Sequence, residues 1–131
     1  MDSETIGVVL LAGGSGGLST YYSPWLATNG NLVYFQCDVI QTDGLGGFSI
    51  EVQTKNSEDS DSVPNGSSAL ATQAITLTAG LPPTEVAAGA NLGSTSAGLK
   101  ELVRLVYKVT GGANYGGFVH FRILNASWLT N

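Results

Sequence analysis

The chain has 131 residues, of which 43% are apolar and 11% are charged, and 18 residues are glycine. A disordered chain would be rich in charge and poor in aliphatic and aromatic residues. This composition therefore excludes extensive disorder and indicates one folded domain, residues 1–131, with many turns. The net charge of −5 argues against a dedicated DNA- or RNA-binding protein, which usually carries a strong basic excess.

A short apolar run lies near the start of the chain. Residues 5–12, TIGVVLLA, predict a strand that is buried on both faces or lies at a subunit contact, and GGSGG over 13–17 predicts a flexible turn. We expect an extended N-terminal arm over residues 1–18. Its apolar side chains are expected to contribute to an assembly interface, namely Val8, Val9 and Leu10.

Two acidic residues near the start of the sequence bear on the expected location of the protein. Asp2 and Glu4 stand where a signal peptide carries basic residues, and no apolar run approaches the roughly 18 residues of a membrane span. We therefore expect no signal peptide, no transmembrane segment and no membrane partner. The expected location is a virion or the cytoplasm.

The same N-terminal run resembles the opening of the sugar nucleotidyltransferases. Those enzymes place a strand before an LAGG-x-G loop, and Val8 to Gly16 of this chain read VVLLAGGSG. The resemblance implies a loop whose backbone N–H groups hold phosphates. Gly17 and Leu18 stand where the family has a basic residue, and no βαβ pattern follows. We therefore favour a structural glycine-rich turn.

An aromatic cluster follows over residues 18–26, where an internal proline indicates an edge strand or an ordered loop. Its Tyr21, Tyr22 and Trp25 would form a sugar-binding platform if they lay together with Trp128. Aromatic residues in a domain of this size more often close the ends of the core. We favour that second interpretation.

Two segments, 31–42 and 46–55, alternate between apolar and polar residues with period two, which predicts strands. Their inward positions are Val33, Phe35, Cys37, Val39, Phe48, Ile50 and Val52. The intervening Asp43-Gly44 predicts a turn that joins the two strands as an antiparallel hairpin. Cys37 is the only cysteine and is expected to be a small buried apolar residue.

Residues 56–68 predict a polar loop that contains Glu58, Asp59 and Asp61. A Ca²⁺ site formed with a neighbouring subunit is one interpretation of these carboxylates, but their spacing does not match an EF-hand. We favour a solvated acidic loop, with no bound metal and no other cofactor. Weak alternation follows over residues 69–80, and a short helical turn is predicted near 84–90.

Residues 99–110 fit either a helical stripe or a strand, and their content of Val, Thr and Tyr favours a strand. Residues 117–125 also alternate and are predicted to pair with that strand as an antiparallel hairpin. Together with the preceding segments, these runs predict an all-β fold. The expected architecture is an antiparallel β-sandwich of jelly-roll type.

Charge is segregated along the chain. Residues up to Leu99 carry a net charge of about −8, whereas those from Lys100 onward carry about +3. The basic residues of the second part are Lys100, Arg104, Lys108 and Arg122, and we expect them to form one basic face. Their acidic partners are expected to be Asp38 and Glu51 in the same sheet, or the Glu58–Asp61 loop of a neighbouring copy. Only the second arrangement contributes to assembly, and it would place the basic residues and the loop carboxylates of Glu58, Asp59 and Asp61 in the assembly interface.

These features predict a self-assembling structural subunit of the capsid, tail, decoration or filament type, with no enzymatic role and with copies of itself as partners. The only histidine, His120, has no recognisable nucleophile or second histidine and is not expected to be catalytic. The alternative is a monomeric carbohydrate- or ligand-binding β-sandwich module. It would use the aromatic cluster and a Ca²⁺-loaded acidic loop.

Overall fold

The computed structural model describes residues 7–12, 17–60, 68–89, 99–112 and 117–129. These residues form nine strands: β1 (Gly7–Ala12), β2 (Leu18–Tyr22), β3 (Leu26–Ala27), β4 (Leu32–Asp43), β5 (Gly47–Lys55), β6 (Ser68–Ala74), β7 (Thr84–Gly89), β8 (Leu102–Thr110) and β9 (Phe118–Leu129). The helical turn predicted near 84–90 is wrong, because β7 occupies that segment. Among all the residues that the structure describes, no helix is long and apolar enough to cross a membrane.

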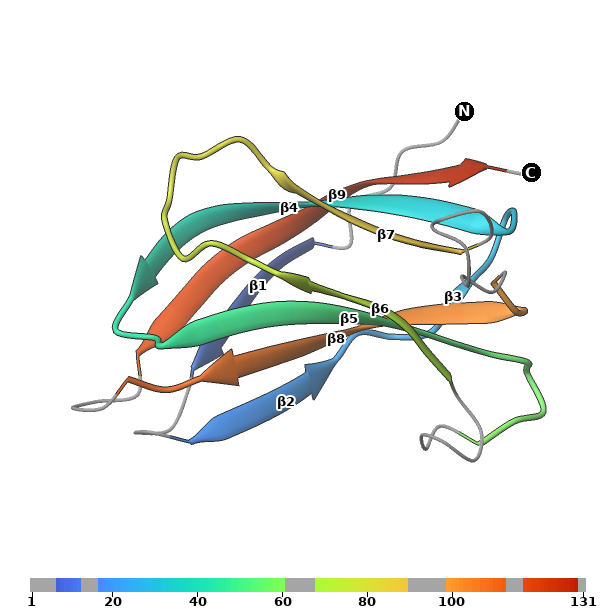
Figure 1. The fold of residues 1–131 in the computed structure, drawn as a ribbon, viewed down its shortest axis with the longest axis horizontal. Coiled ribbons are helices and arrows are strands. Elements are labelled where there is room, and N and C mark those ends of the chain that lie inside the picture. The colour runs from blue at the N-terminus through green and yellow to red at the C-terminus, as the bar shows by residue number, and fades with distance from the viewer. Residues whose placement is uncertain (1–6, 13–16, 61–67, 90–98, 113–116, 130–131) are drawn as a thin grey trace.

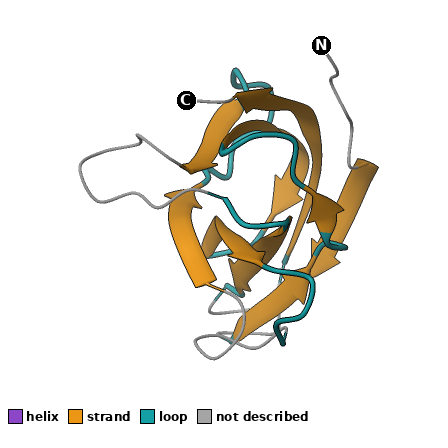
Figure 2. Cartoon of the chain, turned by 90° about the vertical axis from the view of Figure 1, so that its right-hand side faces the viewer, coloured by secondary structure: helices purple, strands orange, loops and turns teal. Residues whose placement is uncertain are grey.

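The strands form two antiparallel sheets that pack face to face (Figure 1). Sheet A has the order β1-β9-β4-β7. Sheet B has the order β2-β8-β5-β6, and β3 pairs with β8 farther along that strand. A view turned by 90° shows the strands arranged around a common interior (Figure 2). The predicted all-β, antiparallel β-sandwich is therefore confirmed, as is the choice of a strand over a helix for 99–110.

The strand pairs are nested along the chain. β1 pairs with β9, β2 with β8, β4 with β7 and β5 with β6, so strands from the first half of the chain run antiparallel to strands from the second half. Further pairing of β4 with β9 and of β5 with β8 joins these pairs into the two sheets. Strands that are neighbours in space are therefore mostly far apart in sequence.

Both predicted hairpins are wrong. The segments 31–42 and 46–55 are strands, but β4 lies in sheet A and β5 lies in sheet B. Both edges of β4 are occupied by β7 and β9, which leaves no position for β5 beside it. The segments 100–110 and 117–125 are divided in the same way, since β8 belongs to sheet B and β9 to sheet A.

The inward faces of the two sheets meet in one hydrophobic core. Every inward position predicted for 31–42 and 46–55 is buried, including Cys37. Phe121 of β9 joins the layers, because its ring centroid lies 4.8 Å from that of Phe48 and 5.1 Å from that of Tyr107, both in sheet B. The period-two pattern therefore identified the core correctly even where it misassigned the strand partners.

Gly117 directly precedes β9, in the connection from β8. Its φ of +85° lies in the left-handed region, and a Cβ at this position would overlap the carbonyl oxygen of Asp43 and the backbone of Gly44. Asp43 pairs with Phe118 at the end of β4. A residue without a side chain is therefore required where the two connections between the sheets meet.

The N-terminal residues that the structure describes belong to the sandwich. Residues 7–12 form β1, the edge strand of sheet A, which pairs with β9 from Gly7–Ile123 to Ala12–Phe118. Residue 18 begins β2, the edge strand of sheet B. These parts of the expected arm over residues 1–18 are thus built into the sheets, and residues 1–6 and 13–16 lie outside the described residues.

Candidate functional site

A cluster of charged, polar and aromatic side chains lies on the outer face of sheet B. Because alternate residues of β8 point into the core, the residues between them and their partners on β5 point outward. The members of this sheet-B cluster are Tyr22, Trp25, Glu51, Gln53, Lys55, Arg104 and Lys108. The alternation of 46–55 predicted that Gln53 and Lys55 point outward, but not that they are buried.

Arg104 is the centre of the sheet-B cluster. Its guanidinium carbon lies 4.3 Å from the ring centroid of Tyr22 and 4.4 Å from that of Trp25. Its Nε donates a hydrogen bond to Oε1 of Gln53 at 2.9 Å. Only 8% of Arg104 is exposed, so these contacts form in a largely desolvated position, where they are stronger than at an open surface.

Lys55 enters the cluster from β5. Its Nζ lies 5.0 Å from the ring centroid of Trp25 and donates a hydrogen bond to the carbonyl oxygen of Asp59 at 3.0 Å. Trp25 therefore contacts two cations. These contacts hold the segment between β2 and β3 over the outer face of sheet B. Val106 lies on that face opposite Tyr22 and is only 1% exposed.

Glu51 neutralises part of the positive charge. Nζ of Lys108 lies 3.1 Å from Oε1 of Glu51, and Nε2 of Gln53 donates a hydrogen bond to the same carboxylate. A continuous chain of polar contacts thus runs from Lys108 through Glu51 and Gln53 to Arg104. The charged and polar groups of the cluster are thus paired with one another within the chain, and their contacts fix the side chains on the outer face of sheet B.

The expected basic face is divided between the two sheets. Arg104 and Lys108 lie on the outer face of sheet B, whereas Arg122 lies on β9 of sheet A. Nε of Arg122 donates a hydrogen bond to Oδ2 of Asp38 on β4 at 3.0 Å. Lys100 is exposed just before β8. The residues are close in sequence, but the chain crosses between the sheets before β9.

The acidic loop is held by hydrogen bonds within the loop and with the side chains of Lys55 and Glu101. Oδ2 of Asp59 accepts a hydrogen bond from the N–H of Asn56 at 3.0 Å, and Glu58 is exposed. Asp61 lies outside the described residues. No group of three or more His, Cys, Asp and Glu residues that could hold a metal ion occurs in the described part of the chain.

The four aromatic residues considered as a sugar platform do not lie together. Tyr22 and Trp25 belong to the sheet-B cluster, where both rings contact Arg104. Trp128 belongs to β9 of sheet A and packs edge-to-face on Phe35, with ring centroids 6.4 Å apart. Trp128 is partly buried and packs against the core, as the second interpretation predicted. That interpretation is wrong for Tyr22 and Trp25, which lie on the outer face of sheet B.

The open edge of sheet B exposes apolar side chains. β2 is the outermost strand of this sheet in the described residues, and its Leu18, Tyr21 and Tyr22 are 66%, 37% and 57% exposed. Half of the large exposed apolar residues of the described chain thus belong to this one strand. Sequence reasoning did not single out Leu18, although the glycine-rich turn before it and the proline after β2 indicated an edge strand.

β1 provides the corresponding edge of sheet A. The backbone of Val8 pairs with Arg122, that of Val9 with Phe121 and that of Leu10 with His120. These three residues were predicted as an assembly interface, and their strand lies at an edge of the sandwich, where a further strand could be added. His120 is half-buried in β9.

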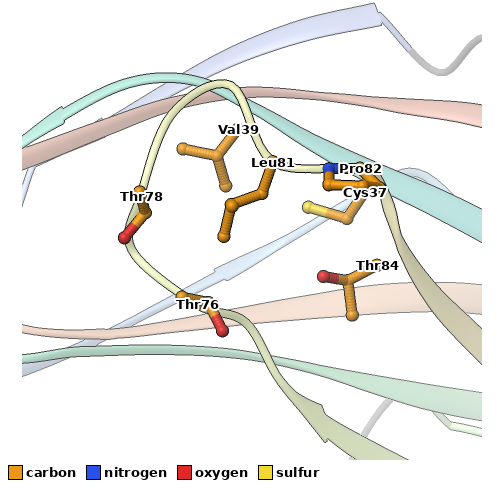
Figure 3. A pocket seen from close by; sticks show the side chains of 7 residues that line it. All are labelled: Cys37, Val39, Thr76, Thr78, Leu81, Pro82 and Thr84. Carbon is orange, nitrogen blue, oxygen red and sulfur yellow. The ribbon is translucent and has the colours of Figure 1, made fainter.

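A small cavity lies beside β4, under the loop that joins β6 to β7 (Figure 3). Its volume is about 40 Å³, and it is lined by Cys37, Val39, Thr76, Thr78, Leu81, Pro82 and Thr84. Sites for small organic ligands usually enclose roughly 300–1,000 Å³. This cavity can hold a water molecule and is too small for a sugar or a nucleotide.

The Cys37 thiol gives the stability a pH dependence. Burial raises the pKa of Cys37 from 9.0 to about 12, and the adjacent Asp38 carboxylate adds to the rise. Burial also raises the pKa of Tyr107 above its ordinary value. In the unfolded chain both groups ionise at lower pH than in the folded chain. The contribution of Cys37 to stability is therefore present in full below about pH 9 and is lost as the pH rises toward 12.

We expect the free energy of unfolding, measured by denaturant titration, to fall between pH 9 and pH 12. The Cys37 thiol contributes at most about 1.4 kcal/mol per pH unit to this fall. In Cys37→Ala the fall should be smaller, and the remainder should reflect Tyr107. The same slope in both proteins would contradict the assignment to Cys37.

No family model matches the chain, and no curated protein and no solved structure matches it either.

Proposed function

We propose that the chain is a structural subunit that assembles with copies of itself, as a capsid, tail, decoration or filament protein does. The observation that carries the proposal is the exposed apolar edge strand β2, with Leu18 and Tyr22 more than half exposed. An edge strand with unpaired backbone groups and apolar side chains is a template for pairing with another chain. The proposed role is structural and not enzymatic, and the proposed location is a virion or the cytoplasm.

The nested strand pairs support a jelly-roll form of the sandwich. A jelly roll arises when a long antiparallel hairpin of strands wraps into two packed sheets, and such a hairpin would form nested pairs like β1–β9, β2–β8, β4–β7 and β5–β6. Jelly rolls occur in viral capsid proteins and in lectins. This likeness of fold is an analogy, and the function must be argued from the residues on the surface.

Charge contributes less to the proposed assembly than apolar area. Arg122 and Lys108 have acidic partners, Asp38 and Glu51, within their own sheets. The exposed Arg122–Asp38 pair is worth less than about 1 kcal/mol. We therefore assign the main contribution to the apolar residues of the edge strands.

Substitution of an edge residue tests the proposal. Sedimentation equilibrium should give an average mass that rises with protein concentration. Leu18→Lys should lower that mass toward the monomer value, because a lysine on an edge strand opposes pairing. Ile40→Lys is the matched control, since Ile40 is 41% exposed on β4, a central strand of sheet A, and its substitution should leave the mass unchanged. A protein that stays monomeric up to about 1 mM, where association would be weaker than about 4 kcal/mol, would contradict the proposal.

The alternative of a carbohydrate-binding module has weaker support. Tyr22 and Trp25 lie together, but both rings contact Arg104, and Trp25 also contacts Lys55. A sugar that stacked on Trp25 would have to displace these cations.

A further inference from the structure

Three residues of β2 direct their backbone groups away from sheet B. The N–H of Gly111 donates to the carbonyl of Gly17 at 2.8 Å, and the N–H of Ser23 donates to the carbonyl of Leu105 at 2.9 Å. In an antiparallel ladder, residues that exchange hydrogen bonds with one neighbour alternate with residues whose groups point to the other side. The odd-numbered residues of 17–23 therefore bond to β8. The even-numbered residues Leu18, Thr20 and Tyr22 present their N–H and C=O groups to the open edge.

This pattern is self-complementary. When a second copy lies antiparallel with Thr20 opposite Thr20, Leu18 of each copy lies opposite Tyr22 of the other. All three pairs then join residues with outward-directed backbone groups, so each pair exchanges both of its N–H···O bonds. A register centred on Tyr21 gives fewer such pairs, because Leu18 of each copy then lies opposite Pro24, which has no N–H.

The side chains match in the same register. Thr20 lies opposite Lys108, so Leu18, Thr20 and Tyr22 share the outer face of sheet B. Leu18 and Tyr22 are 66% and 57% exposed and would form an aliphatic–aromatic cross-strand pair at each end of the contact. β2 contains no charged residue that would repel a second copy.

We propose that two copies of the chain pair through β2, with Thr20 on the two-fold axis, so that their B sheets form one continuous sheet. The inference rests on the proposed function, since it names the contact through which the copies associate. The arrangement is isologous: the same strand of each copy supplies both halves of the contact.

The area of this contact predicts its strength. From their exposed fractions, Leu18, Tyr21 and Tyr22 could remove at most roughly 300 Å² per copy from water, taking about 150–250 Å² for a whole large side chain. A stable interface buries about 800 Å² per partner. Pairing through β2 alone therefore gives a weak, exchanging dimer, which other contacts in a larger assembly would stabilise.

Cysteine cross-linking tests the register. Residues in a hydrogen-bonded antiparallel pair have Cα atoms about 5.5 Å apart, within the roughly 4.4–6.8 Å range of disulfides. Thr20→Cys should therefore form a disulfide-linked dimer under mild oxidation. The native Cys37 does not compete, because it is 1% exposed. Thr72→Cys is the control, since Thr72 is exposed on β6 at the opposite edge of sheet B and should not cross-link.

A mixing experiment distinguishes this register from its neighbours. Leu18→Cys, carrying an affinity tag, is mixed with untagged Tyr22→Cys and oxidised. The mixed dimer should exceed each same-variant dimer several-fold, because residue 18 of one copy is displaced by about 13 Å along the strand from residue 18 of the other. Equal yields of mixed and same-variant dimers would overturn the register. Cross-linking of Thr72→Cys as efficient as that of Thr20→Cys would overturn it as well.

Sedimentation of the reduced variants separates this inference from the proposed function. A chain that associates without position-specific cross-links assembles through another surface, which overturns the β2 pairing and keeps the proposed function. A chain that remains monomeric when reduced and forms no cross-links overturns both.

Discussion

Replacing Phe121 with alanine is expected to lower the free energy of unfolding by about 3–5 kcal/mol. Phe121 is fully buried, and it is the β9 residue whose ring contacts both Phe48 and Tyr107 of the opposite sheet. Its removal would leave a cavity between the sheets that these rings cannot fill without moving apart. Denaturant titration followed by Trp fluorescence or circular dichroism would measure the loss.

The matched comparison is a residue of similar apolar character on the surface. Leu129→Ala should change the free energy of unfolding by no more than about 0.5 kcal/mol, because Leu129 is 47% exposed at the end of β9. A loss below about 1 kcal/mol for Phe121→Ala would show that this ring is not part of the core.

Replacing Arg104 with alanine is expected to lower the free energy of unfolding by about 2–4 kcal/mol. The hydrogen bond from a charged donor contributes about 1.5–3 kcal/mol, and a desolvated cation–π contact contributes up to about 2 kcal/mol. The substitution removes the hydrogen bond to Gln53 and the contacts with Tyr22 and Trp25 together. It should also shift Trp fluorescence, since Trp25 would lose one of its two cations.

Two further variants distinguish the contribution of the Arg104 charge from that of its planar guanidinium and its buried position. Arg104→Lys keeps the charge but loses the planar guanidinium, so it should recover only part of the stability. Arg122→Ala removes an arginine whose side chain is 46% exposed and whose ion pair with Asp38 is worth less than about 1 kcal/mol. Equal losses for Arg104→Ala and Arg122→Ala would contradict the central role of Arg104 in the sheet-B cluster.

The direction of side chains was predictable because it depends on local periodicity. In a strand, successive residues point to opposite faces. The alternating apolar residues of 31–42 form a run long enough to identify which of the two faces is buried. The same reasoning identified Phe48, Ile50 and Val52 as core residues, and all are buried. The sandwich and its core could therefore be predicted from sequence alone.

The partners of the strands were not predictable by the same reasoning. Asp43-Gly44 is compatible with a hairpin, but a turn reports only a change of direction. Whether the next strand returns beside β4 or enters the other sheet depends on β7 and β9, which compete for the edges of β4. These strands lie far along the chain, so no local pattern near residue 43 contains the answer.

The candidate site was missed for a related reason. Gln53, Lys55 and Arg104 have outward parity, and outward polar residues are ordinarily exposed. They are buried because Tyr22 and Trp25, which lie before β4 in the chain, cover them from outside. The proline within the aromatic segment 18–26 indicated an edge strand or an ordered loop. It did not indicate which residues this segment would cover.

Nested pairing makes the fold slow to form. Leu10 pairs with His120, so almost the whole chain must be gathered before β1 has a neighbour. Proteins dominated by such distant pairings fold in roughly milliseconds to seconds, because the entropy of closing large loops opposes the first contacts. During synthesis, β1 and β4 both wait for β9, the strand that lies between them in sheet A. Until β9 has left the ribosome, the edges of β1 and β4 that it will occupy can pair with other nascent chains, so the protein is most prone to aggregate in that interval.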